Sequence, residues 1–92
     1  MTSEPKQAQQ TAGDFGWALN RLWDGAHMQR RGWNGKGMWI ALQRPGVATK
    51  MTLPYMYMST VEGDLVPWVA SQTDQLAMDW QEAEWPPADT AA

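Results

Sequence analysis

Tryptophan is the residue that most constrains this sequence, because seven of its 92 residues are Trp while Phe contributes one and Tyr two. A chain this short does not need seven indoles to fill a core. Indoles also recur at binding surfaces, because each buries a large area at a low entropic cost. The excess therefore predicts that several Trp side chains serve a ligand site or a subunit contact, with Trp80 and Trp85 assigned to a subunit contact.

Charge and residue usage exclude several classes of protein. The chain has ten acidic side chains and seven Lys plus Arg, which gives a net charge of −3. A protein that coats DNA or RNA needs an excess of positive charge instead. Without cysteine and with one histidine, His27, disulfides, zinc sites and other metal sites are not expected. No apolar run is long enough for a membrane span, and the N-terminus lacks the apolar core of a signal peptide. We expect a cytoplasmic protein without a cofactor that binds neither membrane nor nucleic acid.

Both ends of the chain differ in composition from the middle. Residues 1–13 and 86–92 are dominated by small and polar residues, which predicts a disordered arm and a disordered tail. Residues 14–85 are predicted to form a single domain. Burial is marginal for a lone monomer of that size, so we expect a homo-oligomer.

A short amphipathic helix is predicted directly after the N-terminal arm. Asp14 is a suitable N-cap, and Gly25 supplies a C-terminal stop. The predicted helix therefore covers residues 15–24. Its apolar face holds residues spaced at i, i+3, i+4 and i+7, namely Phe15, Ala18, Leu19 and Leu22.

The remainder reads as a small, mostly antiparallel sheet with one further helix. Asn34-Gly35 is a strong hairpin signal, and Ser71 followed by Asp74 resembles a capping box that opens a short helix over 72–79. Pro54 cannot donate to a ladder, so its strand is expected at an edge or with a bulge. The fold class is α+β: one main N-terminal helix packed on the sheet, and a second short helix near the C-terminus. The predicted strands are residues 27–31, 38–43, 51–58 and 65–69, and residues 79–85 are expected to close the sheet.

The segment from Arg30 to Gly37 (RRGWNGKG) is the richest in binding chemistry. It carries two guanidiniums and an ammonium for phosphates, an indole for stacking, and glycines that let a ligand approach the backbone. Arg and aromatic side chains together suit a nucleotide, because every base has a π-face. A tight hairpin with Trp33 in the core explains the same residues without a ligand.

Two other segments carry polar side chains that could serve ligand binding or catalysis. Thr73 and Asp74 can take hydrogen bonds with ribose hydroxyls or an adenine amine, although helix capping also explains Ser71 and Asp74. Glu62 and Asp64 lie on a predicted turn, and no serine sits in a nucleophile-elbow pattern. We therefore do not expect an enzyme.

Four blocks of the chain resemble a family of small phage and prophage proteins that includes the second class of Thoeris anti-defence proteins. The resemblance covers about residues 14–80. The blocks are Asp14–Leu19 (DFGWAL), Arg31–Met38 (RGWNGKGM), Leu53–Met58 (LPYMYM) and Leu65–Asp74 (LVPWVASQTD), followed by Asp79-Trp80.

This resemblance implies an anti-Thoeris sponge that serves immune evasion in the cytoplasm of the bacterial host. Such proteins bind cyclic ADP-ribose isomers made by Toll/interleukin-receptor domain enzymes and sequester them without degradation. The resemblance also implies a homotetramer with ligand pockets between subunits, and some members hold cyclic dinucleotides at a separate site. Two alternatives stay open: an oligomeric phage accessory protein that binds a protein partner through Trp-rich surfaces, and a fold that binds a different nucleotide.

On the resemblance, the ligand-binding residues are assigned by position. Trp33 is expected to stack on the base, and Arg31 and Lys36 to bind phosphates. Asn34 and the Gly35 backbone would close the pocket. The remaining members of the predicted site are Tyr55, Trp68, Thr73 and Asp74, of which Thr73 and Asp74 would take hydrogen bonds from sugar or base.

Overall fold

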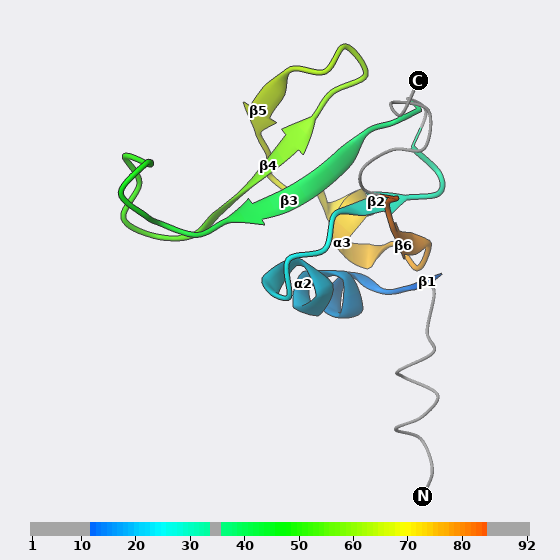
Figure 1. Cartoon of the computed structure of the whole chain (residues 1–92). Coiled ribbons are helices and arrows are strands. Elements are labelled where there is room, and N and C mark those ends of the chain that lie inside the picture. Colours follow the sequence, from blue (N-terminus) through cyan, green and yellow to red (C-terminus); the bar gives the residue numbers. More distant parts are fainter. Residues whose placement is uncertain (1–11, 34–35, 85–92) are drawn as a thin grey trace, which may run out of the picture.

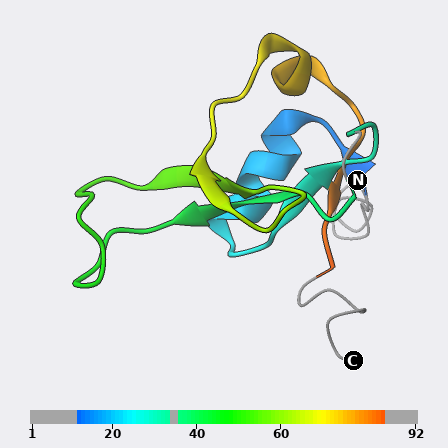
Figure 2. The same ribbon diagram turned by 90° about the horizontal axis from the view of Figure 1, so that it is seen from above.

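The computed structural model describes residues 12–33 and 36–84, and in them two helices lie on one side of a six-stranded antiparallel sheet (Figures 1 and 2). This arrangement confirms the predicted α+β fold. The order of strands across the sheet is β1-β6-β2-β3-β4-β5. The elements are β1 (Ala12–Gly13), α2 (Phe15–Trp23), β2 (Met28–Arg30), β3 (Trp39–Gln43), β4 (Tyr55–Ser59), β5 (Leu65–Pro67), α3 (Gln72–Leu76) and β6 (Trp80–Glu82).

Helix α2 follows the predicted pattern from cap to stop. Asp14 Oδ1 accepts a hydrogen bond from the Trp17 backbone N–H at 2.9 Å. Ala18 and Leu22, both on the predicted apolar face, are buried. Gly25 follows the helix with a φ of 98°, which favours glycine because a Cβ would be strained there. The main helix is therefore confirmed to within a residue.

Proline sets the limits of the last hairpin. The predicted strand over 51–58 is wrong in its first half, because β4 begins at Tyr55, directly after Pro54. The expected edge position or bulge is wrong as well, because β4 is an inner strand between β3 and β5 with unbroken pairing on both sides. Proline has no N–H for the ladder, and Pro54 lies outside the strand. The predicted strand over 65–69 is too long, because β5 ends at Pro67; it forms a free edge of the sheet. Residues 44–54 leave the sheet as a projecting segment, here called the arm (Figure 1).

The two ends of the domain differ from the prediction. Ala12 and Gly13 belong to the N-terminal segment 1–13 that is predicted to be disordered, but they pair with Gln81 and Trp80 as strand β1. Strand β6 is an inner strand between β1 and β2, and it stops at Glu82. Helix α3 has the predicted capping box but ends at Leu76 instead of residue 79, because the backbone at Ala77 is extended. Trp85 lies outside the described residues.

Trp80 is the centre of the core and not a subunit contact. It has no exposed surface and is the largest fully buried side chain of the described residues. The rings of Phe15, Trp33 and Trp68 surround it at centroid distances of 5.3, 5.4 and 6.2 Å. Its indole N–H donates to the Asp74 carbonyl oxygen at 2.9 Å. The prediction for Trp80 fails because β6 lies inside the sheet and packs against helix α2.

The opposite face of the sheet carries a second, smaller cluster. Trp39, Ala41 and Ala83 are buried there, and Tyr57 packs against them. His27 places its ring edge-on to Trp39 at 4.4 Å. Neither helix of the described residues lies on this side, and neither is long and apolar enough to cross a membrane.

Candidate functional site

One guanidinium joins the predicted binding hairpin to the start of α3. Arg30 Nη1 donates to Asp74 Oδ1 at 2.9 Å, and Arg30 Nε donates to Asp79 Oδ1 at 2.8 Å. Asp79 Oδ2 accepts the Gly32 N–H at 2.8 Å, and Asp74 Oδ1 accepts the Trp33 indole N–H at 3.3 Å. These five residues are called the Arg30 network. They fix the turn after β2 relative to α3, although 44 residues separate Arg30 from Asp74 in the chain.

The Arg30 network holds both of its carboxyl groups in the ionised form. Burial raises the pKa of Asp74, but hydrogen bonds from Arg30, Trp33 and Ser71 outweigh that effect, so this pKa lies below its ordinary value. The hydrogen bond from Arg30 likewise lowers the pKa of Asp79, with a further contribution from the Gly32 N–H. The two carboxylates in turn raise the pKa of Arg30. The lone pairs of Asp74 are therefore largely occupied within the chain.

Trp33 is half-buried, which fits part of each of its two predicted roles. Its ring lies edge-on to Trp80 at 5.4 Å, and its N–H points at Asp74. This much matches a core-packed hairpin. The remaining exposed surface of the ring leaves it able to contact a ligand, so stacking on a base stays a prediction.

The other polar residues of the predicted site lie on the surface. Arg31, Lys36 and Thr73 are exposed, and none of the ion pairs among the described residues involves Arg31 or Lys36. Asn34 and Gly35 lie outside the described residues. Along residues 12–33 and 36–84, no group of His, Asp and Glu side chains is arranged to hold a metal ion.

Tyr55 and Trp68 line a hollow of about 750 Å³ along the β5 edge of the sheet, and Trp68 also packs against Trp80, which Trp33 contacts. The wall of the hollow is mostly apolar, and it contains no cationic side chain among its lining residues. A volume of this size is ordinary for a small-molecule site. The wall is built from Gln43, from residues 51–57 at the end of the arm and along β4, and from residues 65–68 along β5.

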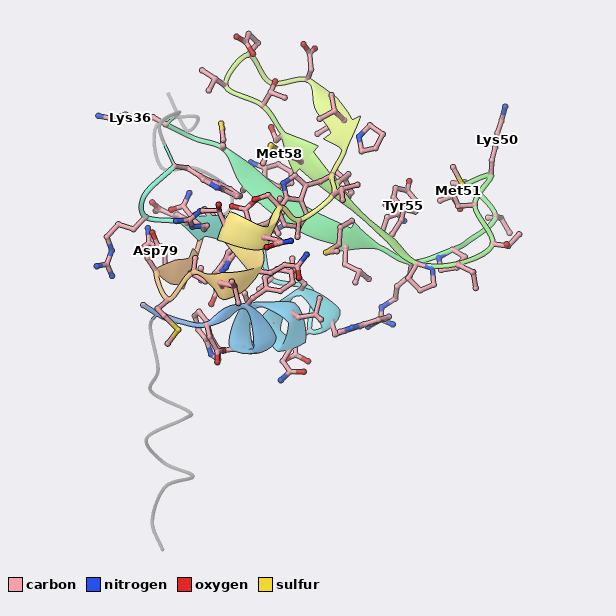
Figure 3. All side chains as sticks on the ribbon, turned by 180° about the vertical axis from the view of Figure 1, so that it is seen from behind. Lys36, Lys50, Met51, Tyr55, Met58 and Asp79 are labelled. Carbon is pink, nitrogen blue, oxygen red and sulfur yellow. The ribbon has the colours of Figure 1, made fainter. Side chains whose placement is uncertain are left out.

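The sheet separates Lys36, a predicted phosphate-binding residue, from this hollow. Gln43, at the end of β3, pairs with Tyr55, whereas Trp39, at its start, pairs with Ser59. Lys36 precedes that start, so it lies at least one strand length, roughly 17 Å, from Tyr55. Figure 3 shows Lys36 and Asp79 on one side of the molecule, with Tyr55, Met51 and Lys50 toward the other. One chain thus brings Trp33 and Asp74 together, but not Lys36 and Tyr55.

Sequence reasoning missed two residues that organise this region. Arg30 was grouped with the phosphate-binding cations, although its charge is neutralised by two carboxylates. Asp79 was not singled out as a site residue at all. No local signal could have found the pair, because their contact spans 49 residues.

Comparisons with known proteins identify the family of the chain. A family model described as the Thoeris anti-defense 2-like domain matches residues 13–83, which include the Arg30 network and the hollow. The chain is also similar to a protein of Bacillus phage SP01 called Thoeris anti-defense 2. The two are 34% identical over 79 residues, covering 72% of this chain and 89% of the relative. Because the family model matches nearly the whole described fold, the chain belongs to the Thoeris anti-defense 2-like family.

Proposed function

We propose that this protein captures a cyclic ADP-ribose-type messenger of the Thoeris system and holds it without degrading it. Membership of the Thoeris anti-defense 2-like family carries the proposal. Sequestration by a phage protein would keep the messenger from its effector and so protect the phage. The chemistry of the candidate site supports the choice of ligand.

A messenger of this type offers a purine, two riboses and a pyrophosphate, and these parts need different partners. The purine and riboses suit the aromatic, mostly apolar hollow that contains Tyr55 and Trp68. The pyrophosphate needs cations, and none lines the hollow. Lys36 is exposed at the other side of the molecule, and so is Arg31, whose backbone N–H donates to the Asp79 carbonyl oxygen there. We therefore propose that the complete pocket forms between copies of the chain in a homo-oligomer, which would be a tetramer if it follows the resemblance.

Binding without turnover is supported by the state of the acidic residues. Asp74 and Asp79 accept hydrogen bonds from Arg30 and have lowered pKa values, which does not suit a general acid or base near neutral pH. We propose a binding protein, with intact ligand released on unfolding.

The test separates capture from conversion. The protein is incubated with cyclic ADP-ribose isomers and, separately, with cyclic dinucleotides, and is removed by ultrafiltration. It is then denatured, and the released material is identified by mass spectrometry. Recovery of intact messenger is expected. Recovery of a cleaved product would contradict the proposal, and so would no depletion of any cyclic ADP-ribose isomer. Depletion of a cyclic dinucleotide would indicate a second site.

Matched variants assign the ligand contacts. Trp33→Ala should lower capture strongly, whereas Trp33→Phe, which keeps a ring but loses the N–H to Asp74, should retain part of it. Tyr55→Ala tests the hollow, and Arg31→Ala should weaken binding and flatten its salt dependence. Normal capture by Trp33→Ala would place Trp33 in the core alone. Unchanged affinity of Arg31→Ala would remove Arg31 from the pocket.

The exposed apolar side chains favour one other function, the binding of a protein partner. Val69, Leu76 and Met78 are each more than two-thirds exposed around α3, and exposed apolar groups can mark interaction surfaces. A chain that depletes no nucleotide but copurifies with one stoichiometric host protein would support that function.

A further inference from the structure

The hairpin of β4 and β5 carries two exposed patches of opposite charge at its two ends. The arm patch consists of Val47, Lys50, Met51 and Leu53. The turn patch, between β4 and β5, consists of Val61, Glu62, Asp64 and Leu65. Every apolar member of both patches is more than half exposed.

The charges of both patches have no ion-pair partner among the described residues. Lys50, Glu62 and Asp64 are exposed, and none of them takes part in the salt bridges of residues 12–33 and 36–84. The patches cannot meet in one chain, because the five residues of β4, roughly 17 Å, lie between them. Figure 1 shows the arm and the β4–β5 turn pointing away from each other.

The base of the arm is fixed, so its direction is a property of the fold. Arg44 Nη2 donates to the Trp23 carbonyl oxygen at the end of α2, at 2.6 Å. The Arg44 guanidinium also lies over the Trp23 ring, 4.9 Å from its centroid. A cation at a helix C-terminus is favourable, and this contact joins the arm to the body.

We propose that a second copy of this chain docks along the hairpin with a twofold axis, so that each arm patch contacts the other copy's turn patch. A twofold axis makes such a contact twice, which closes the assembly, whereas a single head-to-tail contact would propagate into open chains. Apolar contact supplies attraction, and the opposite charges select the antiparallel orientation. The hollow runs between the two patches, since Met51, Leu53 and Leu65 also line it. The docked copy would therefore cover the hollow.

Charge reversal with rescue tests this contact. The inference rests on the oligomeric form of the proposed function and names the surface that forms it. Lys50→Glu should halve the mass of the assembly at micromolar concentration and low salt, as measured by light scattering after gel filtration. The double variant Glu62→Lys/Asp64→Lys should do the same. Combining all three changes should restore the wild-type mass, and Lys50→Arg, which keeps the charge, should leave it unchanged.

Several results would overturn the contact. A wild-type mass that persists in Lys50→Glu, a triple variant that stays dissociated, or a wild-type chain that polymerises without limit would each do so. A monomeric wild-type chain would also overturn it. Thermal unfolding of every variant confirms that its chain still folds. Messenger capture is measured in parallel by the denaturation assay, so loss of the contact and loss of the sponge activity are read separately.

Discussion

Replacement of Arg30 by Met is the sharpest test of the Arg30 network. The change keeps the length and apolar stem of the side chain and removes its charge. The carboxylates of Asp74 and Asp79, whose side chains are 14% and 29% exposed, then lose their cationic partner. A hydrogen bond to a charged group contributes about 1.5–3 kcal/mol when buried. Because these groups are partly exposed, we take the lower end of that range for each of the two Arg30–carboxylate bonds. Subtracting the cost of desolvating Arg30 leaves a net stabilisation of about 2 kcal/mol.

This free energy should be visible in thermal unfolding. For a domain of this size a loss of 2 kcal/mol lowers the Tm by about 10 °C. The assay follows circular dichroism at one fixed protein concentration, because oligomerisation makes the Tm depend on concentration. Arg31→Met is the matched control, since the Arg31 side chain is exposed and outside the network. Its Tm should change little.

The effect should also depend on pH with a defined sign. The pKa values of Asp74 and Asp79 are lowered in the folded chain. Their contribution to stability is therefore complete above the unfolded value of about 3.9 and disappears as the pH falls through the folded values. The difference between wild type and Arg30→Met should shrink as the pH falls below the unfolded value of about 3.9. A variant as stable as Arg31→Met at neutral pH, or a difference that persists undiminished in acid, would refute the reasoning.

Three further predictions concern single side chains. Gly32→Ala places a Cβ 2.9 Å from Asp79 Oδ2 and should lower the free energy of unfolding, measured with denaturant, by about 1–2 kcal/mol. Gly46→Ala is the control: its Cβ enters open space, and the free energy of unfolding should change by less than about 0.5 kcal/mol. Leu22→Ala empties a site that is 1% exposed and should cost about 3 kcal/mol by the same measurement; a loss below about 1 kcal/mol would contradict its core position. Burial lowers the pKa of His27, so protonation favours the unfolded chain and stability should fall as the pH drops below about 6.5. His27→Gln should remove that slope from Tm values measured between about pH 7 and 5.

The predicted site shows which parts of function can be found in sequence. Blocks rich in Gly, Trp and charge located the hairpin after β2 and the start of α3, and the structure joins these two through Trp33 and Asp74. It also separates Lys36 from Tyr55. That separation could not be predicted, because it depends on which end of β3 each residue lies beside.

Local chemistry determined the elements of this protein. The N-cap Asp14 and the positive φ of Gly25 set the limits of α2, and the capping box of Ser71 and Asp74 opens α3, because caps and a positive φ act within a few residues. Only the tertiary structure decided the roles of the tryptophans and the charges. Strand β6 pairs with β2 and β1, which takes Trp80 from an expected interface into the core and brings Asp79 to Arg30. Burial and ion pairing depend on strand order, and strand order is set by contacts between segments some 50 residues apart.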